Sequence, residues 1–306
     1  MIFEIQESEE AGIRLDHYLV QALPEMSRSF LQGRIKEELV LVNGQPSKPG
    51  YLTRLGDEIS VAEISFKEPE ILPEDIPLDI LYEDNDVILV NKPKGMVVHP
   101  APGHYSGTLV NALMHHCKDS LSGINGVLRP GIVHRIDKDT TGVLIACKND
   151  HAHRHIAAQL KEHTITRKYN AIVYNVIKED GTVDAPIGRN PSKDSTERKK
   201  MAIDPVHGRR AVTHYHVIEN LGSKYAHVEC QLETGRTHQI RVHMASIGHP
   251  LVGDNIYGKS KSYLEYGQVL HARVLGFIHP STGDYMEFEA PLPDYFTHLL
   301  SVLSKS

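Results

Sequence analysis

A charged and polar loop lies between two apolar runs in residues 130–145, PGIVHRIDKDTTGVLI. Loops held by rigid strands are where proteins usually display reactive groups. Within this loop Asp137 has the cations Arg135 and Lys138 beside it, which favour its ionised form. An ionised carboxylate can act as a nucleophile or as a general base. An aspartate in such a loop is also a common turn former, so its chemistry depends on what the rest of the chain places around it.

The segments that must position this loop are mainly strands, from Asp79 onward. Many of them alternate polar and apolar residues and return by short loops, which predicts an α+β fold with a mixed, mainly antiparallel sheet. The predicted strands are Val87–Val90, Met96–His99, Ile132–His134, Val143–Cys147, Lys168–Ile177, Ala211–Glu219, Tyr225–Glu233 and Phe277–Ala290, the last with a turn at Pro280–Asp284. Helices flanking the sheet are predicted over Thr108–His116, from a cap at Asp150 to His163, and over Thr237–Ile247.

Residues 12–61 predict a separate small α/β module, because about fifty residues can enclose only a small core. Its expected elements are a helix over Leu15–Leu23, a second helix from a cap at Ser27 to Glu37, a strand over Leu39–Val42 leading into an Asn43-Gly44 turn, and a strand over Ile59–Val61. Residues 62–79 are acidic and interrupted by prolines, which is typical of an extended linker. The larger domain is then predicted to span residues 80–303.

The composition limits the classes of protein to which this chain can belong. The chain has 306 residues and three well-separated cysteines without a C-x-x-C spacing, so neither a disulfide framework nor a zinc ribbon is indicated. It shows no secretory leader and no apolar run of the ~20 residues needed to cross a bilayer. We therefore expect a monomer in the cytoplasm that does not enter a membrane.

The net charge of −6 counts against a simple nucleic-acid binder. The charge is unevenly distributed, however, because residues 62–86 hold nine acidic side chains and one lysine, whereas residues 27–54 hold five basic side chains and two glutamates. Residues 193–210 add six further cations and predict an RNA-facing loop. The global charge hides locally basic surfaces.

The loop sequence HRIDKDTTGVLI resembles the catalytic-loop signature of the RluA/RluD-type RNA pseudouridine synthases, with Ile136 where the pattern usually has leucine. Four more segments resemble that family in the same order: LYEDNDVILVNKPKGMVVHP (81–100), TRKYNAIV (166–173), TGRTHQIRVHMASIGHPLVGD (234–254) and LHARVLGFIHP (270–280). The five ordered segments are distributed over nearly the whole length of residues 80–292. The resemblance implies an enzyme that isomerises uridine to pseudouridine in structured RNA.

The resemblance implies a role for each residue of the loop. Asp137 is expected to be the carboxylate that attacks the target nucleotide at the sugar or base, or that removes a sugar proton to give a glycal, and the sequence leaves these routes open. Arg135 is expected to enter the RNA stack and help extrude the uridine, which costs a few kcal/mol. His134 and Thr141 are expected to bind substrate beside them.

The other segments supply the rest of the expected site. Tyr169 would stack on the flipped uracil and help remove the proton from C5. Arg241 would form the ion pair that positions Asp137, with Arg236 as a second cation and Leu270 as an apolar wall. Taken singly, these residue types are more often a buried strand tyrosine, solvated helix arginines and a packing leucine, so the expectation rests on their order and spacing.

The N-terminal module resembles the alpha-L RNA-binding module of small-subunit ribosomal proteins through RLDHYLVQAL, SRSFLQGRIKEELVLVNGQPSK and GDEI. The resemblance implies that Arg28, Arg34 and Lys36 face the RNA backbone. Because this module accompanies the catalytic domain, large-subunit (23S) ribosomal RNA, alone or within the large subunit or its precursor, is the expected substrate. Transfer RNA is the runner-up.

Two readings from other classes compete with this one. A non-catalytic RNA-binding or ribosome-assembly factor would predict a damaged catalytic loop, whereas the expected residues are all present. A metal-dependent RNA hydrolase would need a ligand set, and the candidates His151, His153 and His155 are spaced so that they point around a helix rather than along one face. We expect no metal and no cofactor, because the isomerisation exchanges one glycosidic bond for another.

Overall fold

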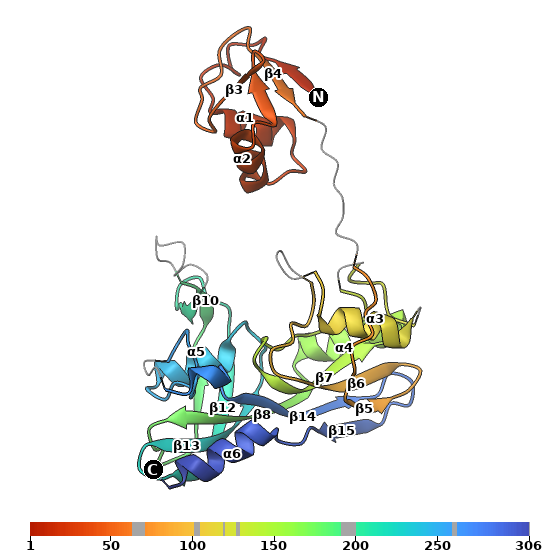
Figure 1. Ribbon diagram of the computed structural model, residues 1–306, viewed down its shortest axis with the longest axis vertical. Helices are drawn as coiled ribbons and strands as arrows, with labels where there is room; N and C mark the ends of the chain where they lie inside the picture. Colours follow the sequence, from red (N-terminus) through yellow and green to blue (C-terminus); the bar gives the residue numbers. More distant parts are fainter. Residues whose placement is uncertain are drawn as a thin grey trace. The chain divides into compact units, whose positions relative to one another are not determined.

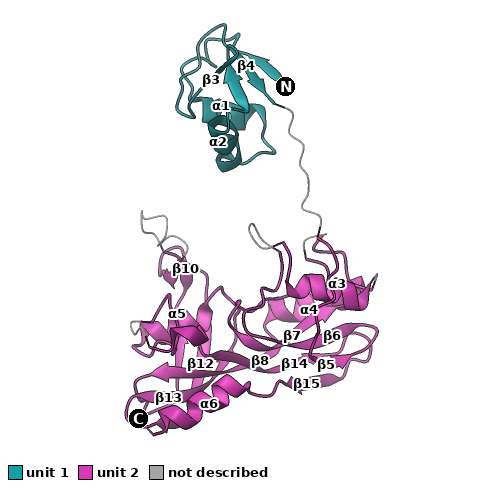
Figure 2. Ribbon diagram, viewed as in Figure 1, with its two compact units in different colours: residues 1–70 teal, residues 71–306 magenta. Residues whose placement is uncertain are grey.

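The computed structural model describes residues 1–62, 71–100, 105–118, 120–126, 129–190, 200–258 and 262–305. The chain divides into two compact units, Met1–Glu70 and Ile71–Ser306 (Figure 2). The division falls within the acidic stretch predicted as a linker. None of the helices in the described ranges is both long and apolar enough to cross a membrane.

The first unit packs two helices on a four-stranded sheet of order β1-β4-β2-β3. The elements are β1 (Ile2–Glu4), α1 (Leu15–Ala22), α2 (Arg28–Lys36), β2 (Val40–Val42), β3 (Gln45–Pro46) and β4 (Glu58–Val61). The Ser27 hydroxyl accepts the N–H of Phe30 and begins α2, as its position predicted. Asn43 and Gly44 both have positive φ, which suits the tight turn between β2 and β3.

The second unit is built on a nine-stranded sheet of order β5-β6-β7-β14-β8-β13-β12-β9, with β15 paired to β14. Its strands are β5 (Ile80–Glu83), β6 (Val87–Lys92), β7 (Thr141–Cys147), β8 (Thr166–Tyr174), β9 (Gly181–Asp184), β12 (Val212–Leu221), β13 (Tyr225–Leu232), β14 (Leu270–Ile278) and β15 (Tyr285–Glu289). β7 and β14 are parallel, and the other neighbours are antiparallel. The prediction of an α+β fold with a mixed, mainly antiparallel sheet is confirmed.

Helices cover both faces of this sheet. They are α3 (Leu109–Cys117), α4 (Asp150–Glu162), α5 (Gln239–Ser246), α6 (Asp294–Leu303) and the short 3₁₀ helix η2 (Leu264–Tyr266). Ala171 and Val173 of β8 belong to the main core with α3 and α4, whereas Ile172 between them packs with α6. Because side chains alternate along a strand, α6 lies on the face opposite α3 and α4 (Figure 1). A small hairpin of β10 (Ile187–Arg189) and β11 (Met201–Ile203) stands apart from the sheet.

Three local predictions were wrong. The segment Met96–His99 is not a strand, because the carbonyls of Val97 and Val98 accept the first N–H groups of α3 instead of joining the sheet. Residues 132–134 form only an isolated bridge at Ile132. The cap of α4 is Asn149, whose Oδ1 accepts the N–H of Ala152, rather than Asp150. The basic residues predicted at 193–199 lie outside the described ranges.

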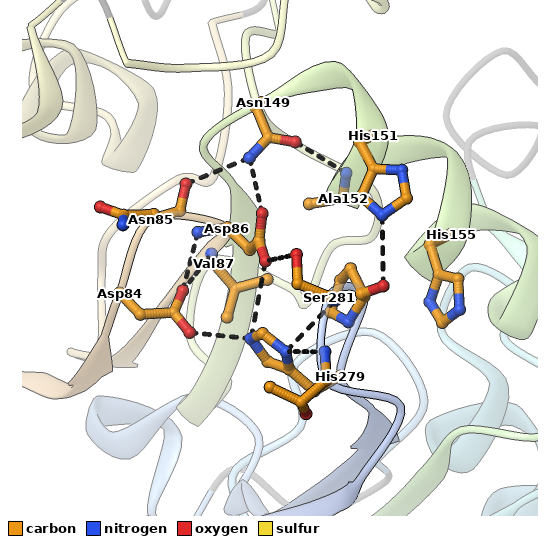
Figure 3. Close-up of polar contacts among 12 residues, drawn as sticks. Asp84, Asn85, Asp86, Val87, Asn149, His151, Ala152, His155, His279 and Ser281 are labelled. Atoms are coloured by element: carbon orange, nitrogen blue, oxygen red, sulfur yellow. Dashed lines mark hydrogen bonds and ion pairs between the residues drawn. The ribbon is translucent and has the colours of Figure 1, made fainter.

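A polar network ties the β5–β6 turn to the start of α4 and to the β14–β15 turn (Figure 3). His279 Nε2 lies 2.8 Å from Asp84 Oδ2, while the N–H groups of Ser281 and Thr282 donate to His279 Nδ1. Asp86 accepts from the Ser281 hydroxyl and, at 2.8 Å, from Asn149 Nδ2. The buried ring of His279 therefore joins two turns that are almost 200 residues apart in sequence.

Replacing His279 by alanine is expected to lower the free energy of unfolding by about 2–3 kcal/mol, because a buried ring is removed and a carboxylate and two N–H groups each lose one hydrogen-bond partner. The measurement is the urea midpoint of wild type and variant by circular dichroism. His151→Ala is the control, since this exposed ring contacts the Pro280 carbonyl and the ring of His155 but takes no part in the His279 hydrogen bonds. Equal midpoints for the two variants would contradict the prediction.

Candidate active site

The centre of the site is an arginine between two carboxylates. Arg241 Nη1 donates to Asp137 Oδ2 at 2.9 Å, while its Nε and Nη2 donate to Asp254 Oδ2 and Oδ1 at 2.7 and 3.0 Å. Arg241 and Asp254 are 3% and 1% exposed, whereas the side chain of Asp137 is 20% exposed. The bidentate contact thus fixes the guanidinium from behind, and Asp137 is the carboxylate that remains accessible.

The electrostatics follow from this arrangement. Burial alone would raise the pKa of Asp254, but the hydrogen bonds and charge of Arg241 outweigh it and lower that pKa. Burial would likewise lower the pKa of Arg241, and its two carboxylate partners raise it instead. Asp254 and Arg241 are therefore both charged at neutral pH.

Arg241 is directed inward by a braced turn. The Gln239 side chain accepts from the Thr234 hydroxyl and from the Arg236 N–H, and it donates to the Val212 carbonyl. His238, with φ +57°, then leads into α5. The first six residues of this helix are buried, so the helix presents Arg241 to the interior rather than to solvent.

The cavity above Asp137 collects residues from four distant segments. Its lining includes Asp137, Tyr169, Arg236, His238, Arg241 and Leu270. Tyr169 of β8 is 8% exposed and lies opposite Ala272 of β14 in the sheet register, two residues from Leu270. Burial raises the pKa of Tyr169, so the phenol is protonated at neutral pH. The cavity therefore combines a carboxylate, a phenol and an apolar wall.

A cationic groove leads out of this cavity toward the end of α4. The charged residues along it are Arg135, Lys161, Arg167 and Arg236, with Asp137 as the acidic one. Arg167 is buried and donates to the Glu233 carbonyl, whereas Lys161 is exposed. The pKa of His163 at the rim is lowered, by burial first and then by Arg167 and other arginines. The groove is locally positive in a chain of net charge −6.

Three other residues of the predicted catalytic loop lie in surroundings that differ from those of Asp137. Arg135 is exposed at the groove, with Nη1 3.4 Å from His99 Nε2. His134 accepts the Ile145 N–H at its Nε2, which braces the loop, and burial with the charge of Arg167 lowers its pKa to about 3. Thr141 is buried and contacts His271 Nδ1 at 2.8 Å, so it does not line the cavity.

The basic residues predicted in the first unit are arranged around its second helix. Arg28 donates through Nε and Nη2 to Asp16 Oδ2, a buried carboxylate that also accepts from Arg14. Arg34 Nη2 donates to the Ala62 carbonyl, and Lys36 is exposed at the end of α2.

Four residues of the site were not singled out from the sequence: Lys92, His238, Asp254 and Tyr257. Lys92 is 0% exposed, and its Nζ donates to the carbonyls of Pro93, Met96 and Lys138. Burial lowers the pKa of this lysine to about 7, against the opposing charges of Asp139 and Asp137. Lys92 thus ties the Lys-Pro-x-Gly turn to the residue after Asp137. The available signal was a lysine two positions after the last residue of the apolar run VILV (87–90).

The three histidines of α4 do not converge on one point, although the rings of His151 and His155 lie 6.4 Å apart. His151 contacts the Pro280 carbonyl, while His153 faces Asn125. Among the described residues, no group of three or more histidine, cysteine or acidic side chains is placed to hold a metal ion.

Comparisons with known proteins agree with the two resemblances found in the sequence, one in the large domain and one in the N-terminal module. Residues 86–246 match the family model described as RNA pseudouridylate synthase, and residues 13–59 match the S4 domain model. A Bacillus subtilis protein named uncharacterized RNA pseudouridine synthase YlyB is 52% identical over 299 residues, covering 97% of this chain and 96% of that protein. The ribosomal large subunit pseudouridine synthase D of Zymomonas mobilis is 47% identical over 310 residues, covering 96% of this chain and 95% of that one.

A solved structure shows the same relationship. The human protein titled RNA Pseudouridylate Synthase Domain Containing 1 is 26% identical, with a TM-score of 0.56, and the match covers 76% of this chain and 97% of that one. The two family models, the relatives and the fold thus converge. The chain belongs to the RNA pseudouridine synthases of the RluA type and carries an N-terminal S4 domain.

Proposed function

We propose that this enzyme converts uridines of large-subunit ribosomal RNA to pseudouridine, with Asp137 as its catalytic carboxylate. The observation that carries the proposal is the accessible Asp137 carboxylate, held by a buried arginine at the base of a cavity with a phenol and an apolar wall. The substrate is inferred from relatives named ribosomal large subunit pseudouridine synthase D and from the S4 domain.

The proposed reaction breaks the bond between N1 of uracil and C1′ of the ribose, turns the base, and joins C5 to C1′. Asp137 starts it by attacking the nucleotide or by removing the C2′ proton, and both routes use the same carboxylate. C5 loses its proton at the end and N1 gains one, so substrate and product are isomers. No electrons are gained or lost overall, and the proposed reaction requires no redox partner.

The surrounding residues are proposed to bind and orient the nucleotide. Tyr169 stacks on the extruded uracil against the wall of Leu270, and its oxygen relays the C5 proton. Arg135 occupies the gap left in the RNA stack, which its exposed position at the groove supports. Arg241 positions Asp137, and Arg236 contributes a second cation.

His134 and Thr141 are proposed to act indirectly, by bracing the loop that presents Asp137. In the S4 domain, Arg28, Arg34 and Lys36 contact the RNA backbone. We place this domain at residues 12–61, a linker at 62–79 and the catalytic domain at 80–303. The protein acts as a monomer in the cytoplasm, which sedimentation of the purified chain and fractionation of cells would test.

The cationic groove is proposed to guide the RNA backbone to Asp137. Replacing Lys161 by alanine is expected to raise KM for the RNA about threefold to tenfold and to reduce the slope of log affinity against log salt concentration by about 0.7 to 0.9, because one phosphate contact is lost. The rate constant kcat stays unchanged. Lys224→Ala is the control, since this exposed lysine of the β12–β13 turn does not line the groove. A salt slope equal to that of wild type would exclude a phosphate contact.

The substrate is tested in cells lacking the gene and restored with wild type or with Asp137→Ala. Pseudouridines are mapped across ribosomal and transfer RNA from reverse-transcription stops at carbodiimide adducts. We expect stops at defined uridines of the large-subunit RNA that only the wild type restores. Dependent sites confined to transfer RNA would overturn the substrate, and the absence of any dependent site would overturn the enzyme's proposed activity.

A further inference from the structure

His238 faces Asp137, and each of its two ring nitrogens has a polar group of another residue nearby. Its Nε2 lies 3.7 Å from Asp137 Oδ2, and its Nδ1 lies 2.9 Å from the hydroxyl of Tyr257. The rings of His238 and Tyr257 meet edge to face at 5.7 Å. The histidine side chain is 18% exposed and lines the cavity, so its orientation bears on the carboxylate.

The partners of Tyr257 decide which nitrogen of His238 carries the proton. The N–H of Met201 donates to the Tyr257 hydroxyl oxygen at 3.0 Å. The hydroxyl hydrogen is then free to donate to His238 Nδ1, which places the imidazole proton on Nε2, toward Asp137. With the other tautomer, the hydroxyl hydrogen would have no acceptor among the described residues.

Charge supports a neutral ring in this position. Burial lowers the pKa of His238, against the opposing charge of Asp137, and Arg241 and Arg135 lower it further. A neutral imidazole with its proton on Nε2 can donate one hydrogen bond to the Asp137 carboxylate without adding a second full positive charge beside that of Arg241. The 3.7 Å separation is longer than a hydrogen bond, and such contacts commonly shorten when substrate closes a site.

Both donors approach the same oxygen of Asp137. Arg241 Nη1 and His238 Nε2 face Oδ2, whereas Oδ1 accepts no hydrogen bond from the described residues. We propose that His238, oriented by Tyr257, is a positioning residue that holds Oδ2 together with Arg241 and so leaves Oδ1 as the reacting oxygen. This inference rests on the proposed role of Asp137.

Tyr257 connects the two positioning groups. Its N–H donates to Asp254 Oδ1, and its ring lies under the Arg241 guanidinium at 5.2 Å. Its hydroxyl joins His238 to Met201, the first residue of β11. The Tyr257 side chain thereby contacts both donors to Oδ2, and the first residue of β11 donates to its hydroxyl.

Three variants separate the effect of hydrogen-bond donation by His238 from the effect of side-chain packing. His238→Leu is expected to lower kcat about 30-fold with KM changed less than about threefold, because a misplaced carboxylate affects the reaction more than binding. His238→Gln keeps an N–H near the Nε2 position and is expected to recover at least about fivefold of that loss. Tyr257→Phe keeps the ring under Arg241 and is expected to lower kcat about tenfold. Melting temperatures within a few degrees of wild type show that the variants are folded.

The connection between the two residues is tested in the double variant. Tyr257→Phe is expected to lower kcat less than about twofold in the His238→Leu background, because its hydroxyl acts through the imidazole. Independent losses in the double variant, or equal kcat for His238→Gln and His238→Leu, would overturn the inference. Single-turnover rates with the mapped RNA fragment provide the readout. Full activity of Asp137→Ala would instead defeat the proposed function, so the two failures are distinguishable.

Discussion

Replacing Asp137 by asparagine is expected to slow pseudouridine formation by at least about 10⁴-fold, because the amide has neither the charge nor the basicity of the carboxylate. The change is nearly isosteric, and the asparagine oxygen can still accept the hydrogen bond from Arg241. RNA affinity should therefore stay within a factor of a few. A carboxylate held in a cavity but not used in the reaction would give a far smaller loss.

The measurement is tritium release from RNA labelled at C5 of uridine, under single-turnover conditions, with RNA affinity from filter retention. Asp139→Asn is the matched control, since this carboxylate lies two residues further along the same loop but does not line either cavity. We expect its rate to fall less than about tenfold. Comparable rates for the two variants would remove Asp137 from the chemistry.

The sequence resemblance located the residues that meet in the cavity but not the ones that hold them. Asp137, Tyr169, Arg241 and Leu270 lie in four separate motifs, and the structure places them around one cavity. The importance of Asp254 comes from its burial against Arg241, which is a property of the fold rather than of the local sequence. A single sequence gives no direct sign of such a partner.

The elements of the fold show the same difference between what the local sequence predicts and what depends on the whole structure. A strand was predicted over Lys168–Ile177, but which helix packs on Ala171 and Val173 and which on Ile172 depends on the order of the strands in the sheet. The helix α6 was not predicted, although Phe296, Leu299 and Leu303 recur at helical spacing and pack with Ile172. A strand was predicted at Val97 and Val98 from their residue types. The sequence pattern alone cannot show that the carbonyls of these residues accept the first N–H groups of a helix.

Replacing Arg241 by methionine is expected to lower the free energy of unfolding of the second unit by about 3–5 kcal/mol, because it leaves the charge of Asp254 buried without a counter-charge. Pseudouridine formation should fall by at least about 10²-fold, since Asp137 loses its positioning group. Urea unfolding and single-turnover rates measure the two effects separately. A variant as stable as wild type would show that the Arg241–Asp254 pair contributes little to the fold.

Adding Asp254→Asn separates the two roles of this arginine. The asparagine oxygen still accepts the N–H groups of Ile256 and Tyr257, while the unpaired charge is gone. The Arg241→Met/Asp254→Asn variant should therefore regain about 2 kcal/mol of stability without regaining activity. Recovery of both would mean that Arg241 serves only to neutralise Asp254.

Acidification gives an independent check, because the pKa of Asp254 is lowered in the folded protein. A carboxyl whose folded pKa lies below its unfolded value contributes stability above the unfolded pKa, and this contribution is lost as the pH falls through the folded value. Wild type should consequently lose more stability than the double variant between neutral and acidic pH. The free energy of unfolding is compared between wild type and the double variant as a function of pH. Parallel curves would show that protonation of the pair is not coupled to folding, whereas curves that converge at acidic pH would assign the difference in stability to Asp254 and Arg241.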